Sequence, residues 1–232
     1  RVESRPLLRP GEVVELVPGL IVTQHSGDGK ANQYFLRGYN LDHGTDFALS
    51  VDSMPVNNPT HGHGQGYADI NFLIPELVSG IDFRKGPYFA EEGDFASAGA
   101  AHIHYFDKLP ENVGSITLGT DKYRRLMAGA SPQIGNGNLL IGAEVMSYDG
   151  PWQNPEDIHR YNGVLRYSWG DASNGFHVAL MGYDAKWDST DQIAQRAVDQ
   201  GIIGRFGSLD SSDGGKTSRY SLSGGAHALI GP

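Results

Sequence analysis

Hydrophobic and polar residues alternate along the second half of the chain, in short segments separated by turns. Residues 139–145 and 161–169 have an apolar side chain at nearly every second position. Successive side chains of a strand point to opposite faces, so this period predicts strands with one apolar and one polar face. The residues assigned to the apolar face are Ile116, Leu118, Leu139, Ile141, Ala143, Val145, Tyr161, Leu165, Tyr167, Trp169, Tyr220, Leu222, Ala226, Ala228 and Ile230. Residues 176–187 also predict a strand, but the pattern leaves open which of its faces looks outward.

The connections between these segments alternate between short and long. Residues 135–137 and 170–175 form short turns, whereas residues 149–158 and the stretch between Trp187 and Ser218 are longer. Outer-membrane barrels alternate short turns with long loops in this way. A soluble antiparallel sandwich would give the same alternation of side chains, so this half alone leaves both architectures open.

The first half of the chain consists of short apolar runs joined by turns rich in Gly, Asn and Asp. The runs that predict strands are residues 20–23, 34–37, 47–51 and 79–84. Residues 11–17 predict one or two helical turns that end at Pro18-Gly19. Asn71 is expected to cap a second short helix at residues 72–78. These elements indicate a small α+β domain.

Composition and charge narrow the class of protein. The 232 residues include 32 Gly and 11 Tyr and only 19% charged residues, which is typical of a turn-rich β protein. The formal net charge of −9 argues against binding to nucleic acid, and the absence of cysteine excludes disulfides and thiolate metal sites. No run approaches the roughly 20 apolar residues of a transmembrane helix. The sequence begins at Arg1 without a Met or a signal peptide, which we interpret as processing or trimming.

Four motifs in the first half follow one another in a specific order. They are Arg37-Gly38-Tyr39, Val51-Asp52-Ser53-Met54-Pro55, Arg84-Lys85-Gly86-Pro87 and Ala98-Gly99-Ala100-Ala101-His102-Ile103. In this order they resemble the plug domain of TonB-dependent outer-membrane receptors. Ser53 and Ala100 stand where that family usually has Gly, and Lys85 stands where it more often has Arg. The resemblance implies an α+β plug domain at residues 1–109, followed at residues 110–232 by the first strands, about six, of an antiparallel transmembrane β-barrel.

The resemblance also implies a function and its partners. Receptors of this family import scarce ligands, such as ferric siderophores or other metal chelates, across the outer membrane of Gram-negative bacteria. The expected partners are TonB with its inner-membrane energising complex, outer-membrane lipid and the small-molecule or metal-chelate ligand. No enzymatic activity and no resident cofactor are expected. The segment that contacts TonB normally lies upstream of the plug, and the residues before Gly11 do not match it. About six strands do not close such a barrel, so we expect the chain to be the N-terminal part of a longer receptor.

A loop at residues 57–69 carries the unusual sequence His61-Gly62-His63. The two histidines could share a metal ion, because imidazole binds Zn, Cu and Ni. A metallohydrolase motif of the H-x-H-x-D-H type fails here, since Gln65 occupies the position of the carboxylate and Gly66 that of the third histidine. The alternative to a metal site is an exposed loop whose histidines bind nothing.

The resemblance assigns further residues to the ligand. In plug domains the loops after the first two motifs face the outside of the cell and touch the transported ligand. The residues expected to contact substrate on that basis are Asn40, Asp42, His43, His61, His63, Gln65 and Tyr67. Loops on a rigid scaffold commonly carry recognition, which makes the assignment physically reasonable. The alternative function is a soluble or surface-attached β-rich module that binds metal at the histidine-rich loop and transports nothing.

Charged residues predict how the plug is held. Arg37, Arg84 and Lys85 are candidates for ion pairs with lumen-facing acids such as Glu144. The alternative is that these cations mark ordinary solvated strand ends. His102 and His104 share one face of a predicted strand, where we expect them to have a structural role.

Overall fold

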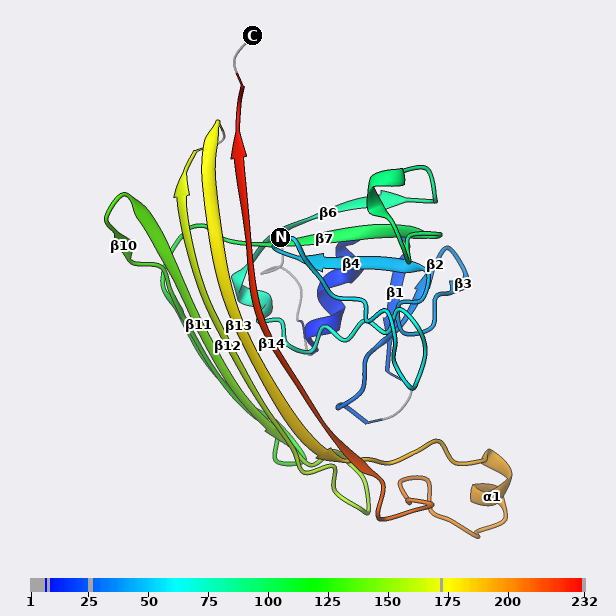
Figure 1. Cartoon of the computed structure of the whole chain (residues 1–232). Coiled ribbons are helices and arrows are strands. Elements are labelled where there is room, and N and C mark those ends of the chain that lie inside the picture. The colour runs from blue at the N-terminus through cyan, green and yellow to red at the C-terminus, as the bar shows by residue number, and fades with distance from the viewer. Residues whose placement is uncertain (1–6, 8, 25–26, 172, 231–232) are drawn as a thin grey trace.

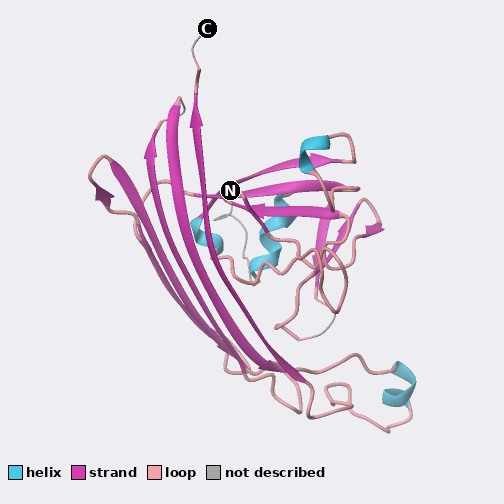
Figure 2. Cartoon of the chain, viewed as in Figure 1, coloured by secondary structure: helices cyan, strands magenta, loops and turns pink. Residues whose placement is uncertain are grey.

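Three β-sheets and a few short helices make up the structure, a computed structural model that describes residues 7, 9–24, 27–171 and 173–230 (Figures 1 and 2). Two small sheets lie in the first half of the chain and form one N-terminal domain. The third sheet has seven strands and occupies the second half. Figure 1 shows the N-terminal domain against the concave face of this third sheet, which we call the wall sheet.

The N-terminal domain begins with a 3-10 helix, η2 (Pro10–Leu16), at the place predicted for a helix. A three-stranded sheet follows, with β1 (Leu20–Thr23), β2 (Gln33–Leu36) and β3 (Tyr39–Asn40) in that order. The helix ends before Pro18-Gly19 as expected, because Gly19 takes a φ of +85° that turns the chain into β1.

The second small sheet has the order β5-β4-β7-β6. Its strands are β4 (Phe47–Val51), β5 (Met54–Pro55), β6 (Val78–Lys85) and β7 (Gly99–Tyr105), and β4 pairs with β7 in parallel. A short 3-10 helix, η4 (Ala90–Glu92), lies between β6 and β7. The strands predicted at residues 47–51 and 79–84 are thereby confirmed.

The helix predicted at residues 72–78 is wrong in extent and in its cap. Only η3 (Pro75–Leu77) is helical, with Ile74 in extended conformation before it. Proline disfavours a helical residue at the position that precedes it, so the helix cannot start earlier than Pro75. Asn71 instead donates a hydrogen bond from Nδ2 to the carbonyl of Lys30 at 3.1 Å, and so ties two loops together.

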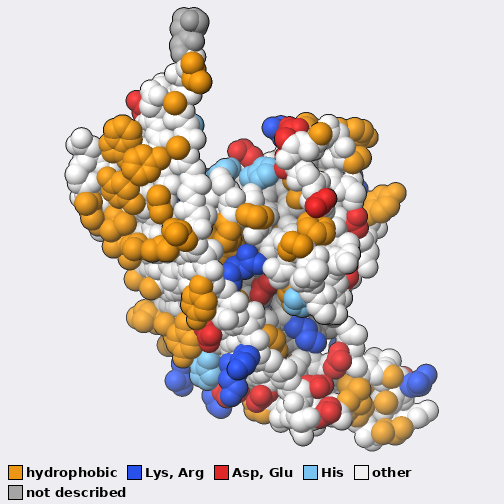
Figure 3. Space-filling view, viewed as in Figure 1, with side chains coloured by type: hydrophobic (Ala, Val, Ile, Leu, Met, Phe, Trp, Pro, Cys, Tyr) orange, Lys and Arg blue, Asp and Glu red, His pale blue; other side chains and the backbone are white. Residues whose placement is uncertain are grey.

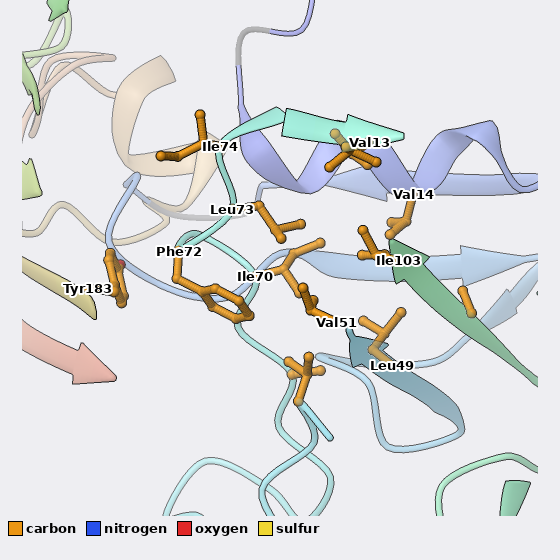
Figure 4. Packing of buried hydrophobic residues seen from close by; sticks show 14 of the residues in the cluster. Val13, Val14, Leu49, Val51, Ile70, Phe72, Leu73, Ile74, Ile103 and Tyr183 are labelled. Atoms are coloured by element: carbon orange, nitrogen blue, oxygen red, sulfur yellow. The ribbon is translucent and has the colours of Figure 1, made fainter. Parts of the chain in front are cut away.

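The core of the N-terminal domain lies between the helix and the four-stranded sheet. Val13 and Val14 of η2 are fully buried, as are Val51 of β4 and Ile103 of β7. Figure 4 shows the two valines facing the strand side chains, with Ile70 and other residues of the 70–74 loop beside them. Full burial of an aliphatic side chain contributes roughly 1.5–3 kcal/mol, so this cluster suffices to hold the short helix on the sheet.

The wall sheet is an antiparallel meander with the order β14-β13-β12-β11-β9-β8. Its strands are β8 (Val113–Leu118), β9 (Arg124–Ala130), β11 (Gly137–Tyr148), β12 (Ile158–Gly170), β13 (Asn174–Asp188) and β14 (Gly214–Ala228), and the two-residue β10 (Gln133–Ile134) pairs with β11. A short helix, α1 (Gln195–Asp199), lies in the long connection between β13 and β14. The predicted division at residue 109 falls between β7 and β8.

The convex face of the wall sheet is apolar and exposed. Ile141, Leu165, Leu180 and Leu222 lie side by side on four neighbouring strands and are 41%, 42%, 49% and 72% exposed. Figure 3 shows hydrophobic side chains gathered over this face. A water-soluble sandwich would have buried this row, so the predicted fold class, a plug-like domain followed by barrel-type strands, is confirmed. The structure also settles β13, in which Leu180 and its alternate neighbours face outward.

The two longest connections of the wall sheet lie at the same end. Successive strands are antiparallel, so alternate connections lie at the same end of the sheet. Residues 119–123, 149–157 and 189–213 lie together at one end, which we call the long-loop end, and the β9–β11 and β12–β13 connections lie at the other. Among the described residues, no helix is long and apolar enough to cross a membrane.

One contact between the N-terminal domain and the wall sheet lies where the sheet lacks side chains. Gly129 and Gly142 are register partners on β9 and β11, and their concave face receives the fully buried side chain of Leu77. A Cβ at Gly142 would lie 2.2 Å from Leu77 Cδ1, and a Cβ at Gly129 would lie 2.9 Å from Leu77 Cδ2. The two glycines therefore form a seat for this one leucine.

Candidate functional site

Asp42, His43 and His63 converge on the surface of the N-terminal domain. One potential ligand atom from each lies within 4.8 Å of the others, and the rings of His43 and His63 meet edge to face at 4.5 Å between centroids. The Asp42 side chain is 51% exposed, whereas that of His43 is 4% exposed. The site therefore has one buried and two accessible members, with two imidazoles and one carboxylate as donors.

The backbone fixes the orientation of His43. Its Nδ1 lies 3.0 Å from the carbonyl oxygens of both Ala31 and Asn32, so we assign the ring proton to Nδ1, where it donates to them. Its Nε2 then faces Asp42, with 3.7 Å to Oδ1. Asp42 has a φ of +51° and donates its N–H to Asn40 Oδ1 at 2.9 Å, which is an Asx turn. The turn aims the carboxylate at the imidazole.

Asn57 holds the histidine-rich loop against this turn, a role that the sequence analysis missed. Its Nδ2 donates to the carbonyls of Gly44, Phe47 and Gly66 at 2.9–3.0 Å, and its Oδ1 accepts from the N–H of Leu49 at 2.7 Å. The only signal in the sequence was an Asn directly before an Asn-Pro turn. Asn57 thus joins both ends of the loop to the segment that carries His43.

His61 and Tyr67 form a second pair beside the site. Their rings stack at 4.0 Å between centroids with 8° between planes, and His61 Nδ1 accepts the N–H of His63 at 3.1 Å. The Tyr67 hydroxyl accepts the N–H of Ala31 at 2.8 Å. Burial raises the pKa of Tyr67 to about 12, so its hydroxyl keeps its proton at neutral pH. The structure groups His63 with Asp42 and His43 and stacks His61 on Tyr67, and the metal pair of His61 and His63 stays a prediction.

The two remaining predicted ligand residues lie at the edge of this surface. Asn40 is exposed, and its Oδ1 also accepts from Gln33 Nε2 at 3.0 Å. Gln65 is exposed in the histidine-rich loop. The structure brings these residues near the Asp42 turn and the His63 loop, and their contact with a ligand stays a prediction.

The site belongs to the long-loop end of the wall sheet. The 27–32 segment, whose carbonyls hold His43, also reaches the β11–β12 connection, where the Asp28 N–H donates to Glu156 Oε1 at 2.8 Å. Gly29 lies directly against the Trp187 ring at the end of β13. Trp187 is 8% exposed and therefore faces inward, although the alternation in its strand had left its face open.

Glu156 makes this contact sensitive to pH. It is 1% exposed; burial raises its pKa to about 7, and the negative charge of Asp28 adds to the shift, while Arg9 opposes it. The ordinary pKa is 4.5, so between pH 4.5 and 7 the folded protein binds more protons than the unfolded chain. The free energy of unfolding should then fall as pH rises through this window, by on the order of 3 kcal/mol in total.

Glu156→Gln tests this expectation, because glutamine keeps an oxygen for the Asp28 N–H but cannot ionise. We expect the variant to lose the fall in stability between pH 5 and 8 and to exceed the wild type above pH 7. Thermal unfolding of the purified protein over this range measures it. Equal pH dependence of the two proteins would contradict the assignment.

Glu144 joins the wall sheet to the N-terminal domain, but with other partners than predicted. Its fully buried carboxylate accepts from Arg125 at 2.6 Å, from Arg160 at 3.2 Å and from Asn162 at 2.9 Å. Arg125 continues to Glu76 of η3 with bonds of 2.6 and 2.8 Å. The N-terminal domain therefore contributes an acid to this network, and the cation comes from the sheet.

The three predicted cations lie elsewhere. Arg84 is 3.9 Å from Glu92 and lies over the Phe89 ring, and Lys85 lies over the Phe83 ring. Arg37 is exposed in the turn between β2 and β3 with a φ of +52°. Their expected pairing with Glu144 is corrected, because Arg125, Arg160 and Asn162 bond to its carboxylate instead. The histidines of β7 are structural as expected: His102 contacts Glu92 and Ser50, and His104 contacts Asp82.

A cavity of about 600 Å³ lies at the opposite, short-turn end between the two domains. Arg166 of β12 lines it and pairs with Asp52 and Asp107 at 2.5 Å each. None of the predicted ligand residues is among the described residues that line it. The cavity therefore marks a second polar junction, separate from the Asp42 site.

Comparison with known proteins identifies the N-terminal domain. Residues 1–100 match the family model of the TonB-dependent Receptor Plug Domain. The N-terminal domain is thus a plug, and the strands after it have the arrangement that follows plugs in TonB-dependent receptors. The match confirms the plug domain that the order of the four motifs had predicted.

Solved structures share the fold. The copper transporter OprC superposes with a TM-score of 0.62 and 16% identity, over 78% of this chain and 29% of that one. The FrpB iron transporter from Neisseria meningitidis gives 0.56 and 18%, over 75% and 29%. A mutant of the ferric enterobactin receptor PfeA from Pseudomonas aeruginosa gives 0.60 and 14%, over 95% and 36%. The chain spans about a third of the length of these proteins, and at such identities the likeness establishes the fold.

Proposed function

We propose that this chain is part of a receptor that imports a metal-containing ligand, such as a ferric siderophore or another metal chelate, across the outer membrane of a Gram-negative bacterium. TonB and its inner-membrane complex would supply the energy. The observation that carries the proposal is the position of Asp42, His43 and His63: donor groups for metals stand on plug loops at the long-loop end. The names of the copper and iron transporters with this fold support the same cargo class.

The exposed apolar face of the wall sheet supports the proposal that the protein lies in a membrane. The row through Ile141, Leu165, Leu180 and Leu222 would face lipid, since an alternating strand in a membrane turns its apolar side outward. The buried, charged row through Glu144 would face the plug inside the barrel. A soluble metal-binding module would rarely expose so large an apolar surface to water.

Metal uptake by whole cells tests the function. The full-length receptor is expressed in a Gram-negative strain that lacks its own metal receptors, with and without TonB, and cell-associated iron, copper and zinc are measured after supply as free ions and as chelates. We expect at least one metal form to accumulate only when both the receptor and TonB are present. Accumulation that ignores TonB, or recovery of the receptor in the soluble fraction, would count against transport and favour the binding module.

A further inference from the structure

We infer that Asp42, His43 and His63 bind a bare divalent transition-metal ion of the Zn, Cu or Ni type through direct coordination. This inference rests on the proposed function and narrows its cargo from a metal-containing ligand to the ion itself. Two imidazoles and one carboxylate are a donor set that such ions prefer, whereas Mg and Ca favour sites made of oxygen alone. Three protein ligands leave coordination positions for water or for a further donor from the wall.

The buried member of the site is arranged as a metal ligand would be. A histidine that coordinates a metal through one nitrogen almost always donates its other ring N–H to a carbonyl or carboxylate, which fixes its orientation. His43 has this arrangement, with Nδ1 bonded to two backbone carbonyls and Nε2 directed to the carboxylate of Asp42. The Asx turn at Asn40 holds that carboxylate in place. These bonds would be retained when an ion enters.

The exposed member can close the site. Two ligand atoms that share an ion at about 2.0–2.2 Å lie roughly 3–4 Å apart, so atoms now within 4.8 Å need to move by only about 1–2 Å. His63 stands between Gly62 and Gly64, and a Cβ at Gly62 would meet nothing within 4 Å. The loop therefore has room to bring the imidazole inward, while Asn57 keeps its two ends fixed.

The structure provides a matched control in His61. It lies two residues from His63 in the same loop, but it stacks on Tyr67 and accepts a backbone N–H through Nδ1. A pairing of the two histidines through sequence proximity alone would make them equivalent. If Asp42, His43 and His63 coordinate the ion, metal binding requires His63 but not His61.

Calorimetric titration of the purified full-length receptor with ZnCl₂, CuCl₂ and NiCl₂ tests the inference. The protein carries an affinity tag without histidine, and the buffer contains no chelator. We expect one ion per receptor for at least one metal, at least about tenfold weaker binding for His63→Ala and Asp42→Asn, and a change below about threefold for His61→Ala. His43→Ala should behave as His63→Ala does; because His43 is buried, the exposed His63 and Asp42 variants carry the test if it fails to fold.

The outcomes separate this inference from the proposed function. No binding of any ion, or equal losses for His61→Ala and His63→Ala, would overturn the site. If TonB-dependent uptake of a chelate persists in that case, the transport function stands without it. Binding with the expected variant pattern, together with uptake that does not depend on TonB, would confirm the site and remove the transport function.

Discussion

Arg125→Ala should weaken the seating of the plug by about 3–5 kcal/mol, the usual effect of removing one partner from a buried ion network. Arg125 bonds to Glu76 on the plug and to Glu144 on the wall, and the Glu144 side chain is fully buried. Without Arg125 the Glu76 carboxylate loses its two bonds to the guanidinium, and Glu144 keeps Arg160 as a cation and Asn162 as a neutral donor. The uncompensated charge should drive the two domains apart.

Thermal unfolding and limited proteolysis of the plug in the full-length receptor measure this effect. Arg84→Ala is the matched control, since Arg84 is 53% exposed and lies 3.9 Å from its acid; we expect a loss below about 1 kcal/mol. Charge reversal of the exposed Arg37 should be similarly mild. Arg125→Lys should fall between the two, because lysine keeps the charge but lacks the fork that reaches both acids. Equal losses for Arg125→Ala and Arg84→Ala would refute the role of the network.

Leu77→Ala should destabilise the receptor by about 2–5 kcal/mol, because it leaves a cavity where the fully buried leucine now packs against the two wall glycines. Gly142→Ala should cost about 1–3 kcal/mol for the opposite reason, since its methyl group would overlap Leu77 Cδ1. The two substitutions together should be less harmful than the sum of their separate effects, because alanine at position 77 leaves room for the new methyl group.

A double-mutant cycle measured by thermal unfolding checks this coupling. Gly163→Ala on β12 serves as the control, since a Cβ there would meet nothing within 4 Å, and a change below about 0.5 kcal/mol is expected. Strict additivity of Leu77→Ala and Gly142→Ala would mean that the leucine does not rest on the wall as described.

The sequence predicted the wall sheet well and the ion pairs poorly, for one physical reason. Strand alternation is local, so the outward positions of Ile141 and Leu165 follow from their neighbours in the chain. The partners of Glu144 depend on register: β9 and β12 flank β11, and this pairing sets Arg125 and Arg160 beside it. No local pattern encodes which residue stands opposite which across two turns.

The candidate site was predicted in its membership but not in its grouping. The motif order pointed to the loops that carry Asp42, His43 and His63, while spacing along the chain favoured His61 with His63. Asn57 brings the loop that carries His63 close to the segment that carries His43, because its side-chain amide bonds to both. A single polar residue that acts through backbone carbonyls leaves little trace in the pattern of hydrophobic and polar positions.

The bonds around Glu144 have a consequence for a moving plug. Arg125 and Arg160 both belong to the wall, so they stay with this carboxylate whatever position the plug takes. Departure of η3 would expose Glu76 to water, where an acid is well solvated, and would leave the buried Glu144 with both of its arginines. Of the ion pairs in this network, such a departure would break the Arg125–Glu76 pair and keep both pairs of Glu144, so no buried carboxylate would lose its cations.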